Sequence, residues 1–480
     1  MNPYIAAFIC VCGIAGLFYL DRDRSLRPSK ALWLPTIYLW VVGSRAASSW
    51  FSGSASDSVN SQLDSSPIDT MVYAGLLLAM VAVLSSRWRE VSRLLSRNWP
   101  ILTYLLFCVV SVTWSEHPGI AFKRWVKSLD DLTMVLIVVT DSQPVDALKR
   151  LVSRIGFVLL PLSLLFIKYF PLLGRGYSPD GMLMNTGVTT NKNVLGVVLL
   201  VVSLGTFWKT VTLWRSKATP DRKRHLWAQG VLLAFGLVLL KMTDSATSLV
   251  CFVIGSGFIL LANRRAVRMR PARIHLLCIG IVLVAGLILL LGVGGSVAQA
   301  LGRTSSLSGR TQIWAAVIPA APNAFVGAGY ESFWMSSNVE IFQHNMIGWW
   351  HPENLNEAHN GYIEVYLNLG WIGLALIGCI LVSGYKRAIA AFKRNPSVGA
   401  LMLAYVIISP VYAITEAGFR SPDPMWIFLL LAIISSTAIT AGFGWETIPS
   451  QSRERVPRQI SRRREVSAWA LQDRSLPQKF

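Results

Sequence analysis

The stretch IHLLCIGIVLVAGLILLLGVG (274–294) contains no aspartate, glutamate, lysine or arginine. A helix that crosses a bilayer needs about 20 predominantly apolar residues. Twelve further apolar stretches, separated by polar segments, lie near 3–20, 31–51, 68–85, 99–114, 126–140, 154–170, 193–208, 226–241, 246–262, 362–384, 398–414 and 425–442. The sequence therefore predicts an all-α, polytopic transmembrane helical bundle with about 12–13 spans.

The composition agrees with this fold class. Hydrophobic residues make up 53% of the 480 residues and charged residues 15%, whereas a soluble globular protein carries about 25% charged residues. The low charge and the apolar blocks exclude a soluble multidomain enzyme, a disordered protein and a coiled coil. All six cysteines fall inside apolar blocks, and their spacing matches neither a zinc site nor a disulfide framework.

Basic residues alternate between the two sides of the predicted bundle. Of the 45 Lys and Arg residues, 34 lie in the segments 21–30, 86–97, 141–154, 209–224, 263–273 and 386–394 and in the tail after 444. A thirteen-span topology places all of these on one side, which the positive-inside rule assigns to the cytoplasm. This distribution accounts for the net charge of +20 without a nucleic-acid partner, and it predicts an extracytoplasmic N-terminus.

Four parts are expected along the chain. Residues 1–294 form N-terminal transmembrane helices, 295–361 a large extracytoplasmic loop that carries the chemistry, and 362–444 C-terminal transmembrane helices. Residues 445–480 form a basic cytoplasmic tail, expected to be disordered and to contact anionic lipid. The long loop is expected to be functional, because most connections in compact proteins are far shorter.

Eleven basic residues depart from the positive-inside trend. They lie on the predicted outer side or within spans, where cations at this density suggest an anionic ligand. The arginine fork suits phosphate because it can bind two oxygens at once. The alternative is interfacial snorkelling or ion pairing. The residues are Arg45, Lys123, Arg124, Lys127, Lys168, Arg175, Lys192, Lys241, Arg303, Arg310 and Arg420.

Four histidines, namely His117, His344, His351 and His359, lie on the predicted outer side. Their spacing fits no metal-binding motif, so no metal site is expected. His359 precedes the span that begins near Tyr362, where a lipid-linked substrate would present its head group. Histidine titrates near neutral pH, which suits a general base, although a hydrogen-bonded loop anchor is the alternative role.

Five patches resemble one known family. They are VTWSEHPGIAFKRW (112–125), TTNKNVLGVVLL (189–200), SGRTQIW (308–314), VGAGYESFW (326–334) and AHNGYIEVYLNLGWIGL (358–374). In this order, and with one large loop late in the chain, they resemble the O-antigen ligase and exopolysaccharide polymerase superfamily.

The resemblance implies a membrane glycosyltransferase that uses no metal and no nucleotide cofactor. Such proteins take a glycan linked through pyrophosphate to a polyprenol, transfer it to a hydroxyl and release polyprenyl pyrophosphate. Negative charge grows on the departing pyrophosphate, so cations that bind it more tightly in the transition state accelerate the reaction.

The resemblance also implies residue roles. Arg310 matches the family's loop arginine and Arg124 an upstream basic position, both assigned to the pyrophosphate. His359 matches the family's loop histidine, expected to orient or deprotonate the acceptor hydroxyl. Further candidates are Lys123, Lys192, Arg175 and Arg303 for pyrophosphate, Glu331 and Glu357 as competing bases, Asn360 and Tyr362 for sugar hydroxyls, and Trp349 and Trp350 for stacking on sugars or for an interfacial belt.

Several functions stay open at this point, and one of them is a structural or assembly membrane protein without a ligand, which would leave the loop histidines and arginines without a purpose. The GYESFW patch and the tryptophans before HNGY favour a polymerase that joins lipid-linked repeat units in the bacterial inner membrane, with a chain-length regulator as a candidate partner. A ligase would instead use a lipid A core acceptor. A transporter for the same undecaprenyl-pyrophosphate-linked glycan would need more ionisable residues inside spans, and Arg45 is the one expected well inside a span.

Overall fold

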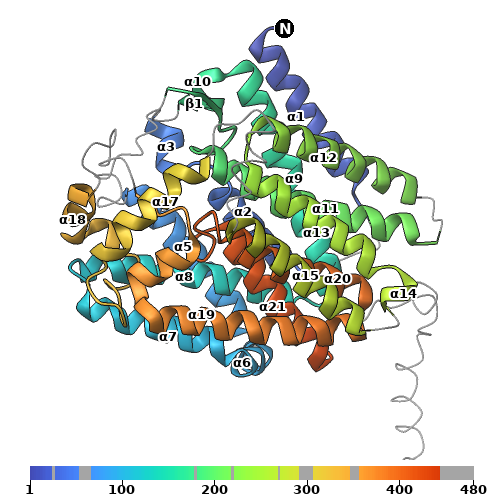
Figure 1. The fold of residues 1–480 in the computed structure, drawn as a ribbon. Coiled ribbons are helices and arrows are strands. Elements are labelled where there is room, and N and C mark those ends of the chain that lie inside the picture. The colour runs from blue at the N-terminus through green and yellow to red at the C-terminus, as the bar shows by residue number, and fades with distance from the viewer. Residues whose placement is uncertain are drawn as a thin grey trace, which may run out of the picture. The chain divides into compact units, whose positions relative to one another are not determined.

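The structure, a computed structural model, describes residues 1–23, 28–52, 66–177, 181–217, 221–268, 271–290, 306–345 and 356–443. This part of the chain is almost wholly helical, which confirms the predicted helical bundle (Figure 1). Seven of its helices are long and apolar enough to cross a membrane: α1 (Pro3–Leu20), α5 (Pro67–Ser85), α9 (Pro144–Tyr169), α11 (Lys192–Arg215), α12 (Arg222–Met242), α19 (Gly361–Arg394) and α21 (Pro424–Ala441).

A bent pair would bring this number to eight. Helix α6 (Trp88–Arg97) turns by 87° into α7 (Trp99–Ser111), which continues as η2 (Val112–Trp114). The remaining helices and 3-10 turns are η1 (Lys30–Leu32), α2 (Trp33–Val42), α3 (Ala47–Ser52), α8 (Pro118–Val139), α10 (Pro171–Gly174), α13 (Ala246–Ala262), α14 (Arg265–Arg268), α15 (Pro271–Leu290), α17 (Ser306–Val317), η3 (Ile318–Ala320), η4 (Phe333–Met335), α18 (Asn338–Asn345) and α20 (Pro396–Tyr412). A helix thus lies at each of the thirteen predicted apolar stretches.

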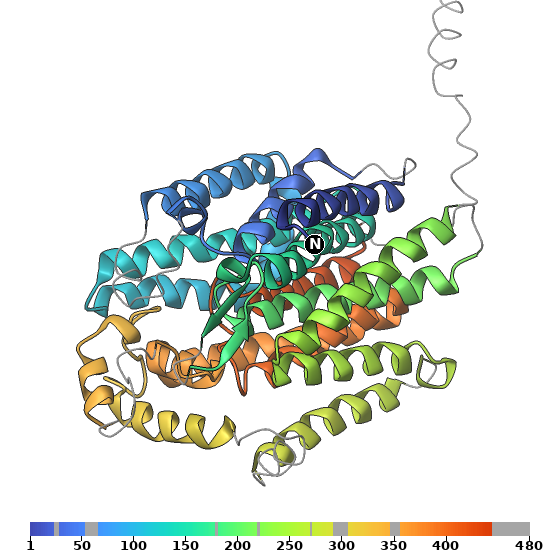
Figure 2. The same cartoon turned by 90° about the horizontal axis from the view of Figure 1, so that it is seen from above.

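The centre of the bundle is formed by α11 and α21. Within the apolar windows of these helices, 78% and 89% of the residues are buried, against 11% for α1 and for α5. Helix α19 packs on α20 and α21, and α20 packs on α13 (Figure 2). The apolar faces of α1 and α5 point away from the protein, as expected for helices whose outer surface contacts lipid.

A buried polar cluster joins four helices at one end. The Lys209 ammonium lies 2.9 and 2.8 Å from the two carboxylate oxygens of Asp21 and donates to Ser153 Oγ at 2.7 Å. His225 Nδ1 lies 3.2 Å from the same carboxylate. Burial would raise the pKa of Asp21, but Lys209 and His225 outweigh it and lower that pKa to about 2. The cluster therefore holds α1, α9, α11 and α12 together through charges that are mutually satisfied.

Arg45 does not lie inside a span, which corrects the prediction. It follows α2 in the connection to α3, is 7% exposed, and donates to the carbonyls of Leu173 and Thr189. These carbonyls belong to a folded connection that contains β1 (Arg175–Tyr177) paired antiparallel with β2 (Leu183–Asn185). The buried guanidinium therefore anchors the connection that leads into α11.

The expectation that spans hold few ionisable residues is wrong for α8. This helix covers the predicted stretch 126–140 and carries Lys127, Asp130 and Asp131, with both aspartates buried. The stretch is apolar on average although it contains these three charged residues.

The described part of the predicted loop 295–361 folds into short helices. Ile313, Val317, Phe333, Trp334 and Phe342 form a small apolar core of their own, together with Leu367 of α19. Figure 2 shows α17 and α18 gathered at the end of the bundle where α19 begins. The boundaries predicted at 294, 361 and 444 stay predictions.

Candidate active site

The segment VGAGYESFW (326–334) is fixed against α19 by backbone contacts. Gly327 and Gly329 adopt positive φ angles of 65° and 96°, which glycine tolerates best. A Cβ atom on Gly327 would lie 2.3 Å from the carbonyl carbon of Asn368. The Asn368 carbonyl accepts from the Gly329 N–H at 2.9 Å, and its side-chain oxygen accepts from the Ser332 N–H at 2.7 Å. The two glycines therefore allow the close approach that holds Glu331 in place.

A buried glutamate joins this segment to the AHNGY patch. Both oxygens of Glu364, on α19, accept from the Trp334 indole N–H, at 3.2 and 3.0 Å. Glu364 also accepts from the backbone N–H of Ala358, whose carbonyl accepts from the Trp314 indole N–H at 2.9 Å. Three patches that are far apart in the sequence are thus tied together immediately before His359.

Arg310 and Glu416 form a short, largely buried ion pair. Arg310, on α17, donates to Glu416 Oε1 at 2.9 Å, and Glu416 lies in the connection between α20 and α21. The other oxygen of Glu416 accepts from the Asn193 amide, in the first turn of α11, at 3.2 Å. The Glu416 side chain is 6% exposed, so its charge is compensated inside the protein rather than by water.

His359 is held between two carboxylates. Its Nδ1 atom lies 2.8 Å from Glu357 Oε1 and 3.8 Å from Glu416 Oε2. Burial would lower the pKa of His359, but Glu357 and Glu416 outweigh it and raise that pKa to about 10. Burial likewise opposes ionisation of Glu357, yet His359, Arg420 and Arg310 lower the pKa of this carboxyl to about 2. The pair is therefore an imidazolium and a carboxylate at neutral pH.

Arg420 and Arg124 approach the other side of the site. Arg420, in the α20–α21 connection, places its guanidinium 3.7 Å from Glu357 Oε2 and 4.0 Å from Glu331 Oε2. Arg124, on α8, donates to the backbone carbonyl of Glu331. Glu331 itself has a positive φ of 50°, an uncommon conformation for a residue with a side chain. Arg310, His359, Glu331, Glu357 and Arg124 are therefore brought together as one centre.

Three other predicted phosphate ligands lie at different places in the described structure. Lys123 is exposed on α8, and Arg175, on β1, donates to the Ile167 carbonyl at 2.9 Å. Lys192 is the first residue of α11, one position before Asn193. Arg303, Trp349 and Trp350 lie outside the described residues.

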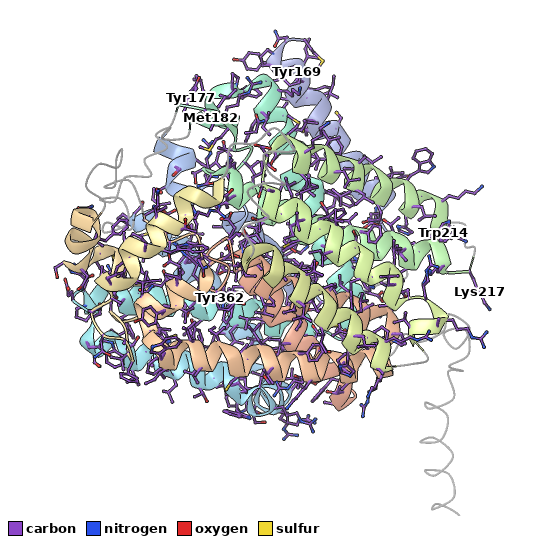
Figure 3. All side chains as sticks on the ribbon, viewed as in Figure 1. Tyr169, Tyr177, Met182, Trp214, Lys217 and Tyr362 are labelled. Carbon is purple, nitrogen blue, oxygen red and sulfur yellow. The ribbon has the colours of Figure 1, made fainter. Side chains whose placement is uncertain are left out.

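Asn360 and Tyr362 have structural contacts at the start of α19. Asn360 caps the helix by accepting from the backbone N–H groups of Tyr362 and Ile363, and its amide donates to the Ile414 carbonyl at 3.0 Å. The Tyr362 hydroxyl, labelled in Figure 3, donates to the Pro410 carbonyl at 3.1 Å. These contacts attach α19 to the end of α20, and binding of sugar by either residue stays a prediction.

Glu416 and Glu364 were not predicted as site residues from the sequence, and no role was predicted for Arg420. Arg420 was noted as a cation on the outer side, and that signal could have placed it at the site. Glu416 is 106 residues from Arg310, and a pairing over such a separation leaves no mark in a single sequence. Glu364 lies within the AHNGYIEVY patch, at a position one helical turn beyond the cap.

Glu357, His359 and Glu416 are also close enough together to be metal ligands. One oxygen or nitrogen atom from each of Glu357, His359 and Glu416 lies within 4.8 Å of the others. A metal would require His359 to lose its proton. Arg310 and Arg420 already balance the carboxylates, so a divalent cation would add uncompensated positive charge. The arrangement fits an anionic ligand better than a metal.

The His359–Glu357 pair predicts a pH-dependent stability. The pKa of His359 is raised, so its contribution to the free energy of unfolding is complete below pH 6.5 and is lost as pH rises through about 10. The pKa of Glu357 is lowered, so its contribution to the free energy of unfolding is complete above pH 4.5 and is lost as pH falls through about 2. In detergent, the unfolding temperature of the wild type should exceed that of His359→Gln most between these values, near pH 5.5. The difference should shrink by pH 9, and a difference that grows with pH would contradict the charge assignment. His275→Gln, on α15, controls for the loss of a histidine.

Comparisons with known proteins cover the segment that carries this centre. Residues 230–378, which include Arg310, Glu331, Glu357 and His359, match the O-antigen ligase family. The exopolysaccharide production protein ExoQ of Rhizobium meliloti (strain 1021) is 27% identical to this chain over 387 residues, which cover 76% of this chain and 81% of that protein. With the apolar helices, these similarities support a multi-pass membrane protein related to the O-antigen ligase and polymerase superfamily.

Proposed function

We propose that this protein polymerises polyprenyl-pyrophosphate-linked oligosaccharide repeat units into exopolysaccharide or O-antigen on the outer face of the bacterial inner membrane. The observation that carries the proposal is the meeting of Arg310, His359 and Arg420 with carboxylates from three other positions. These residues come from α17, from the segment before α19 and from the α20–α21 connection. A centre assembled from such distant segments serves a ligand that all of them contact.

On the donor side, the cations receive the pyrophosphate. Arg310 and Arg420 present guanidinium groups, and His359 is protonated at neutral pH because its pKa is about 10. Hydrogen bonds between ionised partners are about twice as strong as neutral ones, and a guanidinium carries five N–H donors, so these cations can bind a pyrophosphate in addition to their carboxylates. The attraction grows as the phosphate–sugar bond breaks and charge accumulates on the leaving group.

On the acceptor side, a carboxylate takes the proton of the attacking hydroxyl. In this proposal His359 is not the base, because an imidazolium has no free lone pair. Glu357 is a weak base, since its pKa is about 2. Glu331 faces the centre, and its Oε2 atom lies 4.0 Å from Arg420 Nε. We therefore assign Glu331 as the base and His359 as a cation that orients and neutralises phosphate.

The reaction needs no metal in this account. Glu357, His359 and Glu416 carry two negative charges and one positive charge, and the two neighbouring guanidinium groups add two positive charges. The cations of the chain thus supply the charge that a divalent ion provides in other phosphate sites.

A polymerase fits better than a ligase or a transporter. The exopolysaccharide relative is named for a process that requires polymerisation, which favours a second lipid-linked repeat unit over lipid A core as the acceptor. The positive-inside distribution supports a centre on the outer face and a tail after 444 in the cytoplasm. A chain-length regulator is a partner consistent with a polymerase.

Reconstitution tests the activity directly. Purified protein in liposomes that contain lipid-pyrophosphate-linked repeat units, without a separate acceptor, should produce a ladder of longer glycans on a gel. Arg310→Ala should lower the rate of glycan elongation by about 100-fold or more, as for the loss of one preorganised charge-stabilising donor. Lys168→Ala, which removes an exposed cation at the end of α9, should leave this rate unchanged. An excess of EDTA should leave the ladder unchanged.

The outcomes separate the three functions. A wild-type protein that makes no ladder but transfers glycan after addition of a lipid A core acceptor is a ligase. A protein that does neither, yet moves the lipid-linked glycan across the bilayer, is a transporter. Loss of the ladder in EDTA would overturn the metal-independent mechanism.

The charge of His359 can be tested by replacement. His359→Lys preserves a cation and should retain more transfer activity than His359→Gln, which has the shape of histidine without its charge. The wild-type rate should not fall as pH drops through 6.5, the usual pKa of histidine, because the imidazole is already protonated. Equal loss of transfer activity in both variants, or a wild-type rate that falls below pH 6.5 with a histidine-like pKa, would indicate that His359 is the general base.

A further inference from the structure

Two adjacent residues of α8 carry carboxyl groups that are buried in the helical bundle. Asp130 is 1% exposed and Asp131 is fully buried. Tyr38, on α2, donates its hydroxyl to Asp131 Oδ1 at 2.6 Å. Among the residues that the structure describes, neither oxygen of Asp130 nor Oδ2 of Asp131 has a hydrogen-bond partner. Because they are buried without such a bond, these carboxyl oxygens disfavour the ionised form of the pair.

The charges around the pair do not balance two carboxylates. Lys127, three and four positions before them on α8, brings one positive charge, and its ammonium lies 3.9 Å from the centre of the Tyr73 ring. Helix α5 adds the Asp69 carboxylate and α8 adds the Arg124 guanidinium, two charges near Lys127 that offset each other. Tyr38 and Tyr73 contribute neutral hydroxyls. Two ionised carboxylates would thus leave a net negative charge in a low-dielectric core, at a cost of several kcal/mol.

The pair also adjoins the candidate active site. Tyr330, next to Glu331 in the chain, interacts with Ser128 and Asp131. Ser421, next to Arg420, interacts with Asp131 from the α20–α21 connection. Two neighbours of the residues that face the substrate therefore reach the same buried carboxyl.

We propose that Asp130 and Asp131 form a proton-binding site in the core of the bundle, which holds one proton at neutral pH and takes up a second during glycosyl transfer. The second part rests on the proposed function. Protonation converts one carboxylate into a neutral acid, so that Lys127 balances the other. This charge state leaves no net charge on the three groups.

The proton balance of glycosyl transfer gives the site its role. The acceptor O–H bond breaks, its oxygen bonds to the anomeric carbon, and the bond between that carbon and the phosphate oxygen breaks with its electrons going to the pyrophosphate. The released proton goes to Glu331 and from there to the carboxyl pair. It then leaves for water before the next transfer, so that Glu331 is again a carboxylate when the next acceptor arrives.

A purely structural role for the pair predicts a different response. Replacing a buried charged group by a neutral one of similar volume is often neutral or stabilising when that charge has no function. A cation site is a less suitable alternative, because the Lys127 ammonium already places a positive charge beside both carboxyls.

Infrared difference spectroscopy tests the site without turnover. The wild-type protein at neutral pH should show the C=O stretching band of a buried carboxylic acid, with the shift expected in heavy water. Asp130→Asn or Asp131→Asn should remove or displace the band, whereas Asp146→Asn, which removes a carboxylate paired with Lys149 on α9, should not. Absence of the band in the wild type would overturn the proposal.

Tyr38→Phe covers the case in which the asparagine variants do not fold. It removes the 2.6 Å hydrogen bond to Asp131 with little change of shape. The carboxylic acid band should move to higher frequency, because the C=O group loses a donor. An unchanged band would place the proton on a carboxyl group other than Asp131.

The transfer assay tests the role of the site. Asp131→Asn should lower the transfer rate by about tenfold or more relative to Asp146→Asn, with a larger solvent isotope effect than the wild type. If Asp131→Asn transfers glycan at the wild-type rate although the wild type shows the carboxylic acid band, the pair binds a proton but has no part in transfer. That result would overturn the second part of the proposal. A wild-type protein inactive in both ladder and ligation assays would reject the proposed function, and the infrared result would still decide whether the pair binds a proton.

Discussion

The ion pair between Arg310 and Glu416 is the interaction on which the rest of the centre depends. It joins α17 to the α20–α21 connection at 2.9 Å, and Glu416 also receives the amide of Asn193 from α11. His359 lies 3.8 Å from the same carboxylate. Because a buried charge without a partner is costly, these segments have to meet in one arrangement. Folding of the late loop and assembly of the centre are therefore one event.

The same constraint determines the chemistry that the centre offers. A histidine between two carboxylates is held as a cation, with a pKa of about 10, and is unsuited to accept a proton. The cations can bind phosphate oxygens through their further N–H donors while the buried carboxylates keep their partners. Such a preorganised charge distribution needs little rearrangement as the leaving group develops its charge.

The fold and part of the centre could be predicted from the sequence because they have local signals. Long apolar stretches mark the helices, and short motifs mark Arg310 and His359. The partner Glu416 could not be predicted, since ion pairing across distant segments depends on tertiary structure. The carboxyl groups of Asp130 and Asp131 were visible in the sequence, but a hydropathy average over 126–140 hides them.

Direct binding of the released lipid tests the central claim, that the cations of the centre hold pyrophosphate. The dissociation constants of a polyprenyl pyrophosphate and of the matching polyprenol should be measured for the wild type and for Arg310→Ala. The account predicts that the substitution weakens pyrophosphate binding by about tenfold or more, the value of one hydrogen bond to a charged group, and leaves polyprenol binding unchanged. Equal affinity of both proteins for the pyrophosphate would contradict it and reduce the Arg310–Glu416 pair to a structural contact.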